Sequence, residues 1–424
     1  MPVRAAIRGM TSDRREPMVS TRRWFETPLL IASLLSSVSF GAVLFVALPY
    51  LTGDLGGTSW QVGLVGALYP CCYASAMLAG RRILDRFRPR SIAVVGNLLL
   101  VLATLAMGAA DSVAVLCVAS AICGAATSWH WPPVMGLIST GCEGAALNRR
   151  LGRFNAAWST GLVVGPAIGG WLYDIHAVLP FAVGASMHVI CAILIWSTRV
   201  ERAEQGTSSS YPADDDGPQP GQELANPQTP VYRSMARVAL VCSFLVVGVL
   251  RNQLPVLAEN ELGIGASRFG PIGTVFSIAH TAGFALLGIT AAWHFRERLL
   301  WIVQAGLGLS LLIVYCAKSD VALFACSILA GLGISFLYAS HLFYGVSGGR
   351  RRARLMSIHE TLLSIGFLFG AFGGGMVAEI AGLRSPYVVF CAVLLLGVVV
   401  EMVIFTGRGA GRIANGKQRT TSIE

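Results

Sequence analysis

One arginine interrupts a long apolar stretch in the second half of the sequence. Arg251 lies within Leu250-Arg-Asn-Gln-Leu-Pro255, two residues before Gln253. A guanidinium inside a membrane span is costly and marks a functional site by default. With Gln253 it could bind a carboxylate or phosphate of a substrate, it could pair with Glu259 or Glu261 in a gate, or it could extend outward to the membrane interface. The sequence leaves these roles open.

Two further ionisable residues could carry protons. Glu360 lies early in a later apolar run, beside His359. An acidic side chain that faces each side of a membrane in turn can bind and release a proton, so Glu360 is the leading candidate for proton coupling. An ion pair with arginines at 350–354 or in the first half is the alternative. His280 is the second candidate because imidazole titrates near neutral pH, although a neighbouring hydroxyl group often satisfies a lone helix histidine.

Aromatic side chains form the third group of candidates. The stretch Trp129-His130-Trp131-Pro132-Pro133 places an imidazole between two indoles, and its prolines remove backbone donors and bend a helix. Indole faces suit flat or cationic ligands, whereas packing or a place at the membrane interface is the alternative. We expect Trp129 and His130 to contact a substrate. Four more aromatic residues are expected in the cavity wall: Tyr69, Tyr73, Trp158 and Tyr338.

The elements that carry these residues are predicted to be membrane-spanning helices. Hydrophobic residues make up 54% of the 424 residues and charged residues 13%, and the mean hydropathy is +0.64. This composition is wrong for a soluble protein. Apolar runs long enough to cross about 30 Å of hydrocarbon recur along nearly the whole chain. We predict twelve spans, near 27–51, 59–81, 91–110, 113–140, 151–173, 180–198, 234–258, 268–293, 299–317, 320–345, 354–378 and 385–406.

The charged residues indicate the orientation of these spans. Basic residues crowd alternate gaps between the spans, and acidic residues prevail in the opposite gaps. By the positive-inside rule both termini are cytoplasmic, which requires an even number of crossings. The net charge of +10 is therefore a topology signal and gives no reason to expect a nucleic acid partner. The ten cysteines have no metal-ligand spacing, so we interpret them as small core residues.

The chain divides into two halves that resemble each other. Residues 199–232 have the Ser-, Pro- and Asp-rich composition of a disordered linker. Across this linker, Ala47-Leu-Pro49 and Gln253-Leu-Pro255 are 206 residues apart, and Gly63 and Gly270 are 207 apart. We therefore predict an all-α membrane fold of two pseudo-symmetric six-helix bundles with the substrate site between them. The predicted units are a basic tail at 1–24, bundles at 25–198 and 233–406, the cytoplasmic linker at 199–232 and a tail at 407–424.

A glycine ladder in the fifth span recurs in the eleventh. Gly161, Gly165 and Gly169 are four residues apart on one helical face, with Pro166 and Gly170 between and beside them. Small residues at this spacing let a neighbouring helix approach closely. About 205 residues later the pattern returns as Gly366, Gly370 and Gly374. We favour a surface that packs and also acts as a pivot over a passive contact.

These features together resemble the major facilitator superfamily. The resemblance rests on twelve spans in two sets of six, the loop Gly80-Arg-Arg-Ile-Leu-Asp85-Arg-Phe-Arg-Pro-Arg90 and the Gly-Pro-x-x-Gly-Gly element of the fifth span, and it covers about 380 residues. It implies transport by alternating access and a gating role for Asp85, Arg86 and Arg90. The fifth-span element is similar to the signature associated with proton-coupled antiporters.

Energy for transport is expected to come from a gradient. The sequence has no Gly-rich phosphate loop followed by Lys-Ser/Thr and no catalytic or metal constellation, so we expect no enzyme, no metal and no cofactor. We predict a monomeric secondary transporter of the inner (plasma) membrane, surrounded by lipid and moving a small organic solute. Efflux of a hydrophobic compound or metabolite by proton antiport is the preferred function. Uptake or export of an organic anion or sugar centred on Arg251 is the first alternative, and a non-transporting receptor or assembly factor is the second.

Overall fold

The computed structural model describes residues 19–79, 87–139, 144–198, 228–290, 292–346 and 352–420. Every regular element within these ranges is a helix. The described ranges contain eleven helical segments that are long and apolar enough to cross a membrane. The predicted all-α membrane fold is therefore confirmed.

The first half of the chain contains the helices that precede the linker. They are α1 (Val19–Ala42), the π-helix η1 (Val43–Ala47), α2 (Leu48–Asp54), α3 (Ser59–Ala79), α5 (Pro89–Gly108), α6 (Val113–Ser128), α7 (Trp131–Ser139), α8 (Gly144–Ile175) and α9 (Leu179–Ser197).

The second half contains six long helices. They are α10 (Thr229–Leu262), α11 (Ala266–Gly288), α12 (Glu297–Cys316), α13 (Asp320–Val346), α14 (Arg352–Ala381) and α15 (Ser385–Thr420). α10 begins within the stretch predicted as linker, and α15 continues through most of the stretch predicted as a tail.

The one predicted span missing from these eleven segments is the fifth (151–173), which lies in α8. α8 is one continuous helix of 32 residues with Pro166 inside it. Its glycines and Pro166 contribute little hydropathy. The same small residues let α1 and α11 pack closely against α8, while Val164 and Trp171 on its remaining surface stay exposed.

The fourth predicted span is broken where its prolines predict a bend. α6 ends at Ser128 and α7 begins at Trp131. Pro132 and Pro133 have no backbone N–H, so the carbonyls of Ser128 and Trp129 cannot accept the usual helical hydrogen bonds. The helix therefore stops for two residues at Trp129 and His130.

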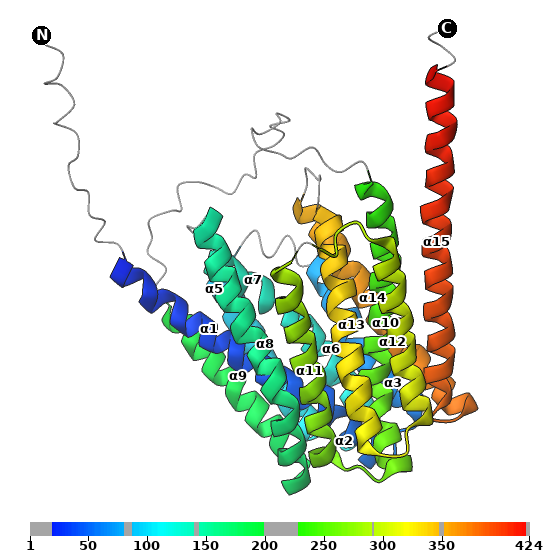
Figure 1. The fold of residues 1–424 in the computed structure, drawn as a ribbon. Helices are drawn as coiled ribbons and strands as arrows, with labels where there is room; N and C mark the ends of the chain where they lie inside the picture. Colours follow the sequence, from blue (N-terminus) through cyan, green and yellow to red (C-terminus); the bar gives the residue numbers. More distant parts are fainter. Residues whose placement is uncertain are drawn as a thin grey trace, which may run out of the picture.

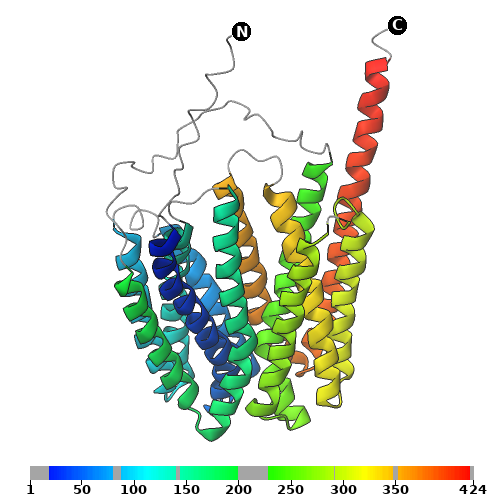
Figure 2. The same ribbon diagram turned by 60° about the vertical axis from the view of Figure 1, so that its left-hand side comes forward.

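The two halves lie side by side as bundles, which is clearest in Figure 2. Within the first half α1 packs along α8, and within the second α10 packs along α14. Across the boundary, α3 packs on α14 and α8 packs on α11. α8 and α14 therefore take equivalent places, each in contact with both halves.

The two ends of the bundle differ in charge. α1 begins and α15 ends at the same end, which Figure 1 shows at the top. We call it the basic end, because five arginines of the helices lie near it: Arg90, Arg150, Arg153, Arg296 and Arg298. The opposite end is the acidic end, where α2, α8 and α10 approach their last residues with Asp54, Asp174 and Glu259.

Candidate functional site

The two glycine ladders bring helices of the same half into backbone contact. In α8, a Cβ added to Gly165 would lie 2.6 Å from the backbone oxygen of Val38 in α1. In α14, a Cβ added to Gly370 would lie 2.0 Å from the backbone oxygen of Leu245 in α10. No larger residue permits these approaches without a shift of the backbone. The other ladder glycines contact the same partner helices: Gly161 and Gly169 on α1, and Gly366 and Gly374 on α10.

Neighbouring positions on these helices contact the opposite half. A Cβ on Gly170 of α8 would lie 2.1 Å from the backbone oxygen of Ala266 in α11, and the backbone oxygen of Pro166 also faces α11. In the equivalent pair, a Cβ on Gly63 of α3 would lie 2.4 Å from the backbone oxygen of Ala371 in α14. The geometry places the ladders where the halves meet, and their role as a pivot stays a prediction.

Hydrogen bonds between described residues of the two halves lie at the acidic end and near the middle of the helices. They run from Tyr50 Oη to Ile264 O (2.9 Å), from Ser59 N to Glu379 Oε2 (3.0 Å), from Gln253 Nε2 to Ser59 O (3.2 Å) and from Thr274 Oγ1 to Val163 O (2.8 Å). The halves are thus joined at the acidic end. Gln253, predicted to bind substrate, is buried in this seam.

Arg251 lies at the boundary between the halves. Its guanidinium carbon is 3.6 Å from the ring centroid of Phe45 in η1 and 4.6 Å from that of Phe276 in α11. Aromatic faces attract a guanidinium and leave its N–H donors in place. Among the described residues Arg251 has no hydrogen-bond acceptor and no ion pair, and Glu261 pairs with Arg384 instead. The predicted gate pair between Arg251 and Glu261 is therefore not formed in this structure.

Glu360 lies in a pocket between the halves. The pocket encloses about 270 Å³ of empty space. It is lined by Tyr73, Ala74, Met77 and Leu78 of α3 and by Glu360, Thr361 and Ser364 of α14. Among the described residues Glu360 has no ion-pair or hydrogen-bond partner. The alternative ion pair with arginines at 350–354 lies outside the residues whose side chains are described.

Of the predicted wall residues, Tyr73 lines this pocket, and Tyr69 and Tyr338 lie close to Tyr73. The rings of Tyr69 and Tyr73 are stacked with centroids 6.5 Å apart. Tyr338 of α13 is close enough to interact with Glu360 in its own half and with Tyr73 across the boundary. The structure therefore brings Tyr69, Tyr73, Tyr338 and Glu360 together, as a shared cavity requires.

A row of rings connects this pocket with Arg251. Tyr338 contacts Phe284 with ring centroids 5.4 Å apart, and Phe284 contacts His280 at 4.5 Å. His280 in turn stacks on Phe276, the ring that Arg251 contacts from another side. His280 Nε2 is buried and has no hydrogen-bond partner among the described residues. Arg251, His280 and Glu360 thus belong to one aromatic-walled region.

His130 and Trp129 lie apart from this region. His130 is fully buried in the first half, where Asn97 Nδ2 donates a 2.8 Å hydrogen bond to His130 Nδ1. Asn97 Oδ1 accepts from His188 Nδ1, and Ser39 Oγ lies 3.1 Å from His188 Nε2. This network holds helices of one half together. Trp129 forms the C-cap of α6 beside it, and no described contact links Trp158 to Arg251 or Glu360.

The predicted gating loop is described only at its end. Asp85 and Arg86 lie outside the described residues. Arg90 is the second residue of α5, and its guanidinium lies 4.6 Å from the ring centroid of Trp196 and donates to the backbone oxygen of Trp196. Both residues belong to the first half, so this contact fastens α5 to α9.

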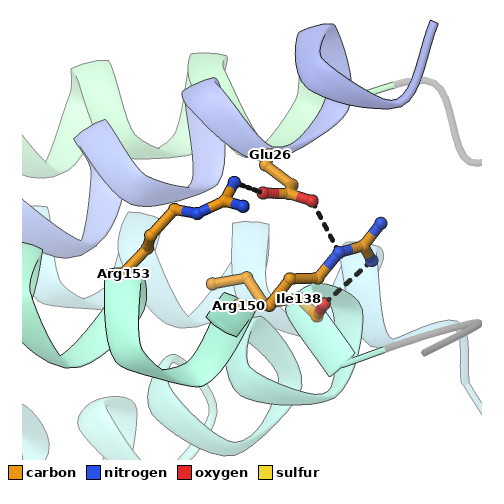
Figure 3. A network of polar contacts seen from close by, with 4 residues as sticks. All are labelled: Glu26, Ile138, Arg150 and Arg153. Atoms are coloured by element: carbon orange, nitrogen blue, oxygen red, sulfur yellow. Dashed lines mark hydrogen bonds and ion pairs between the residues drawn. The ribbon is translucent and has the colours of Figure 1, made fainter. Parts of the chain in front are cut away.

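A charged cluster at the basic end was not anticipated from the sequence. Glu26 of α1 accepts from Arg150 and Arg153 of α8, each at 2.5 Å, as Figure 3 shows. Arg150 Nη1 also donates to the backbone oxygen of Ile138 in α7 at 3.2 Å. One sequence signal was available. Glu26 is an acidic residue at the start of an apolar run, and its charge is opposite to that of the basic stretch before the glycine ladder.

Comparison with known proteins identifies the fold. The model of the Major Facilitator Superfamily matches residues 29–250 and 236–421. The chain belongs to this superfamily. The resemblance inferred from the sequence is therefore confirmed over both halves.

Several relatives of the chain are named for drug resistance. The chain is 24% identical over 390 residues to multidrug resistance protein 1 of Bacillus subtilis, covering 89% of this chain and 95% of that protein. It is 19% identical over 365 residues to quinolone resistance protein NorA of Staphylococcus aureus, covering 84% and 90%. A 30% identical segment of 190 residues matches puromycin resistance protein pur8 of Streptomyces alboniger, covering 43% and 37%.

Solved transporter structures share the fold. A peptide transporter in complex with sulfate superposes with a TM-score of 0.72 at 13% identity, covering 90% of this chain and 94% of the other. A bacterial homologue of the human lysosomal transporter Spinster, in an inward-facing and unoccupied conformation, gives 0.66 at 17% identity, covering 91% and 95%. The chain is thus a multi-pass membrane transporter of the major facilitator superfamily and not an enzyme.

Proposed function

We propose that this transporter exports a hydrophobic compound or metabolite in exchange for protons. The position of Glu360 carries the proposal. It is an acidic side chain of the second half, in a pocket whose other wall belongs to the first half, and no described residue neutralises it. The aromatic rings around it suit a hydrophobic solute. The drug-resistance names of relatives support efflux as the direction of transport.

The arrangement of the halves suggests how proton and solute exchange. The halves are joined at the acidic end, so rocking about α8 and α14 would open that end and narrow the pocket at Glu360. A proton on Glu360 removes an unpaired charge from the pocket, which allows closure around it. Binding of solute and binding of a proton would then alternate at one place, as antiport requires.

Exchange of Glu360 for glutamine tests the proposal. In reconstituted vesicles we expect Glu360→Gln to abolish flux driven by a proton gradient and to preserve solute counterflow, because counterflow needs no proton cycle. Asp111→Asn serves as the matched control, since Asp111 is exposed between α5 and α6. Gradient-driven flux in Glu360→Gln with an unchanged pH dependence would refute the assignment. A broad solute panel in the same counterflow assay would name the substrate class.

An organic anion is the second candidate substrate. The observation in its favour is the guanidinium of Arg251, which has two aromatic contacts and no acceptor among the described residues. A carboxylate on a flat solute could accept hydrogen bonds from this group while its ring packs on Phe45 or Phe276. No comparable observation among the described side chains favours uptake or export of a sugar.

We further propose that the basic end faces the cytoplasm, as the positive-inside rule predicts. Both termini and the linker then lie on the cytoplasmic side of an inner (plasma) membrane. The protein would act as a monomer with no cofactor, drawing energy from the proton gradient. Labelling of an engineered cysteine at Thr58, which is exposed at the acidic end, with a membrane-impermeant reagent in intact cells tests this orientation. If that cysteine is protected from the reagent, the acidic end faces the cytoplasm and the proposed orientation is wrong.

A further inference from the structure

We propose that Glu401 is a second proton-binding site, formed inside the second half with Gln304 and separate from the pocket of Glu360. The site does not depend on the proposed direction of transport or on the solute. It is a place where a carboxyl group in the membrane interior holds a proton in this conformation.

The burial of Glu401 is the first observation. Its relative exposure is 0%, and neither carboxyl oxygen has a hydrogen-bond partner among the described residues. Glu401 lies in the last third of the membrane-spanning part of α15, on the side of the basic end. One helical turn after Glu401, the ring of Phe405 is in edge contact with Trp301 of α12.

Gln304 of α12 forms the second part of the site. It is also 0% exposed and lies beside Glu401. Its Nε2 donates a 3.0 Å hydrogen bond to the backbone oxygen of Leu394, which fixes the orientation of the amide. Its Oε1 is buried and has no donor among the described residues. The site thus contains a Gln304 side chain with an unpaired acceptor beside the carboxyl group of Glu401, whose two oxygens have no partner among the described residues.

Gly397 shows that the helices are shaped around these groups. It lies one helical turn before Glu401, and a Cβ added to it would come within 2.7 Å of both Gln304 Nε2 and Cys242 Sγ. Gly397 therefore leaves room for the ends of the Gln304 and Cys242 side chains where α10, α12 and α15 meet. The thiol of Cys242 is the other titratable group that faces Glu401.

Among the residues whose side chains are described, no basic group faces the site from the helices packed against α15. The charged side chains and histidines along these helices have other surroundings: Arg233 bonds to Tyr344, Arg237 lies near His341, Arg251 contacts Phe45, Glu297 accepts from Tyr232, Arg298 is exposed, His359 bonds to His341 and Glu360 lies in the pocket with Tyr73. Among these described side chains an ionised Glu401 has no counter-ion.

Protonation of Glu401 removes the need for a counter-ion and supplies a hydrogen-bond donor for Gln304 Oε1. A buried carboxylate with no counter-ion and no hydrogen bonds is among the most costly groups in a membrane protein. A protonated carboxyl group is neutral and supplies one O–H donor, which is what Gln304 Oε1 lacks. Because Glu401, Gln304 and Cys242 belong to α15, α12 and α10 of the second half, this proton acts on packing within that half.

Infrared difference spectroscopy tests the protonation state directly. Wild type, Glu401→Gln and Glu360→Gln would be compared at neutral pH in lipid nanodiscs. We expect wild type to show a carbonyl stretching band of a protonated carboxylic acid that is lost in Glu401→Gln and retained in Glu360→Gln. Loss of only the ionised carboxylate bands in Glu401→Gln would overturn the proposal.

A second variant keeps the test decisive if Glu401→Gln does not fold. Gln304→Leu retains Glu401 and removes its amide partner, so the same carbonyl band should shift to higher frequency as the hydrogen bond is lost. An unshifted band would exclude Gln304 as the partner, and absence of the band in both wild type and Gln304→Leu would show that Glu401 is ionised. Neither infrared measurement requires transport. A negative result for Glu401 is therefore distinct from a negative result for the proposed antiport.

Discussion

The guanidinium of Arg251 packs on the ring of Phe45 at 3.6 Å, although the two residues belong to different halves of the protein. Any rocking that separates η1 from α10 must change this contact. Phe276 provides a second face at 4.6 Å from within the second half, so the guanidinium stays in place when Phe45 moves. The cation is held by rings and keeps its hydrogen-bond donors for another group.

Replacing Arg251 should separate anionic from neutral solutes. We expect Arg251→Gln to lower counterflow of an aromatic carboxylic acid about 10- to 100-fold, because a hydrogen bond to a charged group contributes about 1.5–3 kcal/mol. Counterflow of the corresponding neutral amide should stay within about twofold, since that solute loses no ion pair. Arg251→Lys keeps the charge without the planar fork and should lie between. Equal losses for both solutes would instead indicate a gating role.

The two faces of α8 should respond differently to an added methyl group. Gly170→Ala places a Cβ 2.1 Å from Ala266 O in the opposite half, whereas Gly165→Ala places one 2.6 Å from Val38 O in the same half. We expect Gly170→Ala to separate the halves at the acidic end. Gly165→Ala should lower stability without opening that end, because its clash lies inside one bundle.

Spin labels on the two halves can measure this opening. Thr58 and Lys318 are exposed at the acidic end, one in each half, and suit labelling in a background without the native cysteines. The label distance should increase in Gly170→Ala only. Gly306→Ala is the control, because its Cβ would meet nothing within 4 Å while helix propensity rises equally. An increase in Gly165→Ala as large as in Gly170→Ala would contradict the pivot.

The sequence was sufficient for the fold because its signals are local or repeated. The length of the apolar runs predicted the membrane spans. The recurrence of Gly161 to Gly169 as Gly366 to Gly374 predicted that the two halves are duplicates. Partners of single polar residues are set by packing between distant segments, and sequence spacing does not encode them. The indoles beside His130 suggested a ligand site, yet the helix break turns His130 toward Asn97 in its own half. Glu401 is an acidic residue inside the last predicted span, a signal of the same kind as Arg251, but its place beside Gln304 and Gly397 is set by packing between distant segments.

The cluster at the basic end should stabilise the first half. Glu26→Gln leaves Arg150, whose side chain is only 9% exposed, without its carboxylate. We expect a loss of about 1–3 kcal/mol in unfolding free energy, measured by thermal or denaturant unfolding in detergent. Arg153→Gln should cost less than about 1 kcal/mol because the Arg153 side chain is 53% exposed. A larger loss for Arg153→Gln than for Glu26→Gln would show that this assignment of roles is wrong.

A substitution at Asn97 tests whether the buried histidines of the first half have a structural role. Asn97 Nδ2 donates to His130, and its Oδ1 accepts from His188, so Asn97→Leu leaves both imidazoles without that partner inside the bundle. We expect a loss of about 2–3 kcal/mol in unfolding free energy, since buried unsatisfied polar groups are costly. The solute profile in counterflow should be unchanged relative to wild type, because Asn97, His130 and His188 make no direct contact with Arg251 or Glu360 among the described residues. A changed solute profile at normal stability would return His130 to the list of substrate contacts.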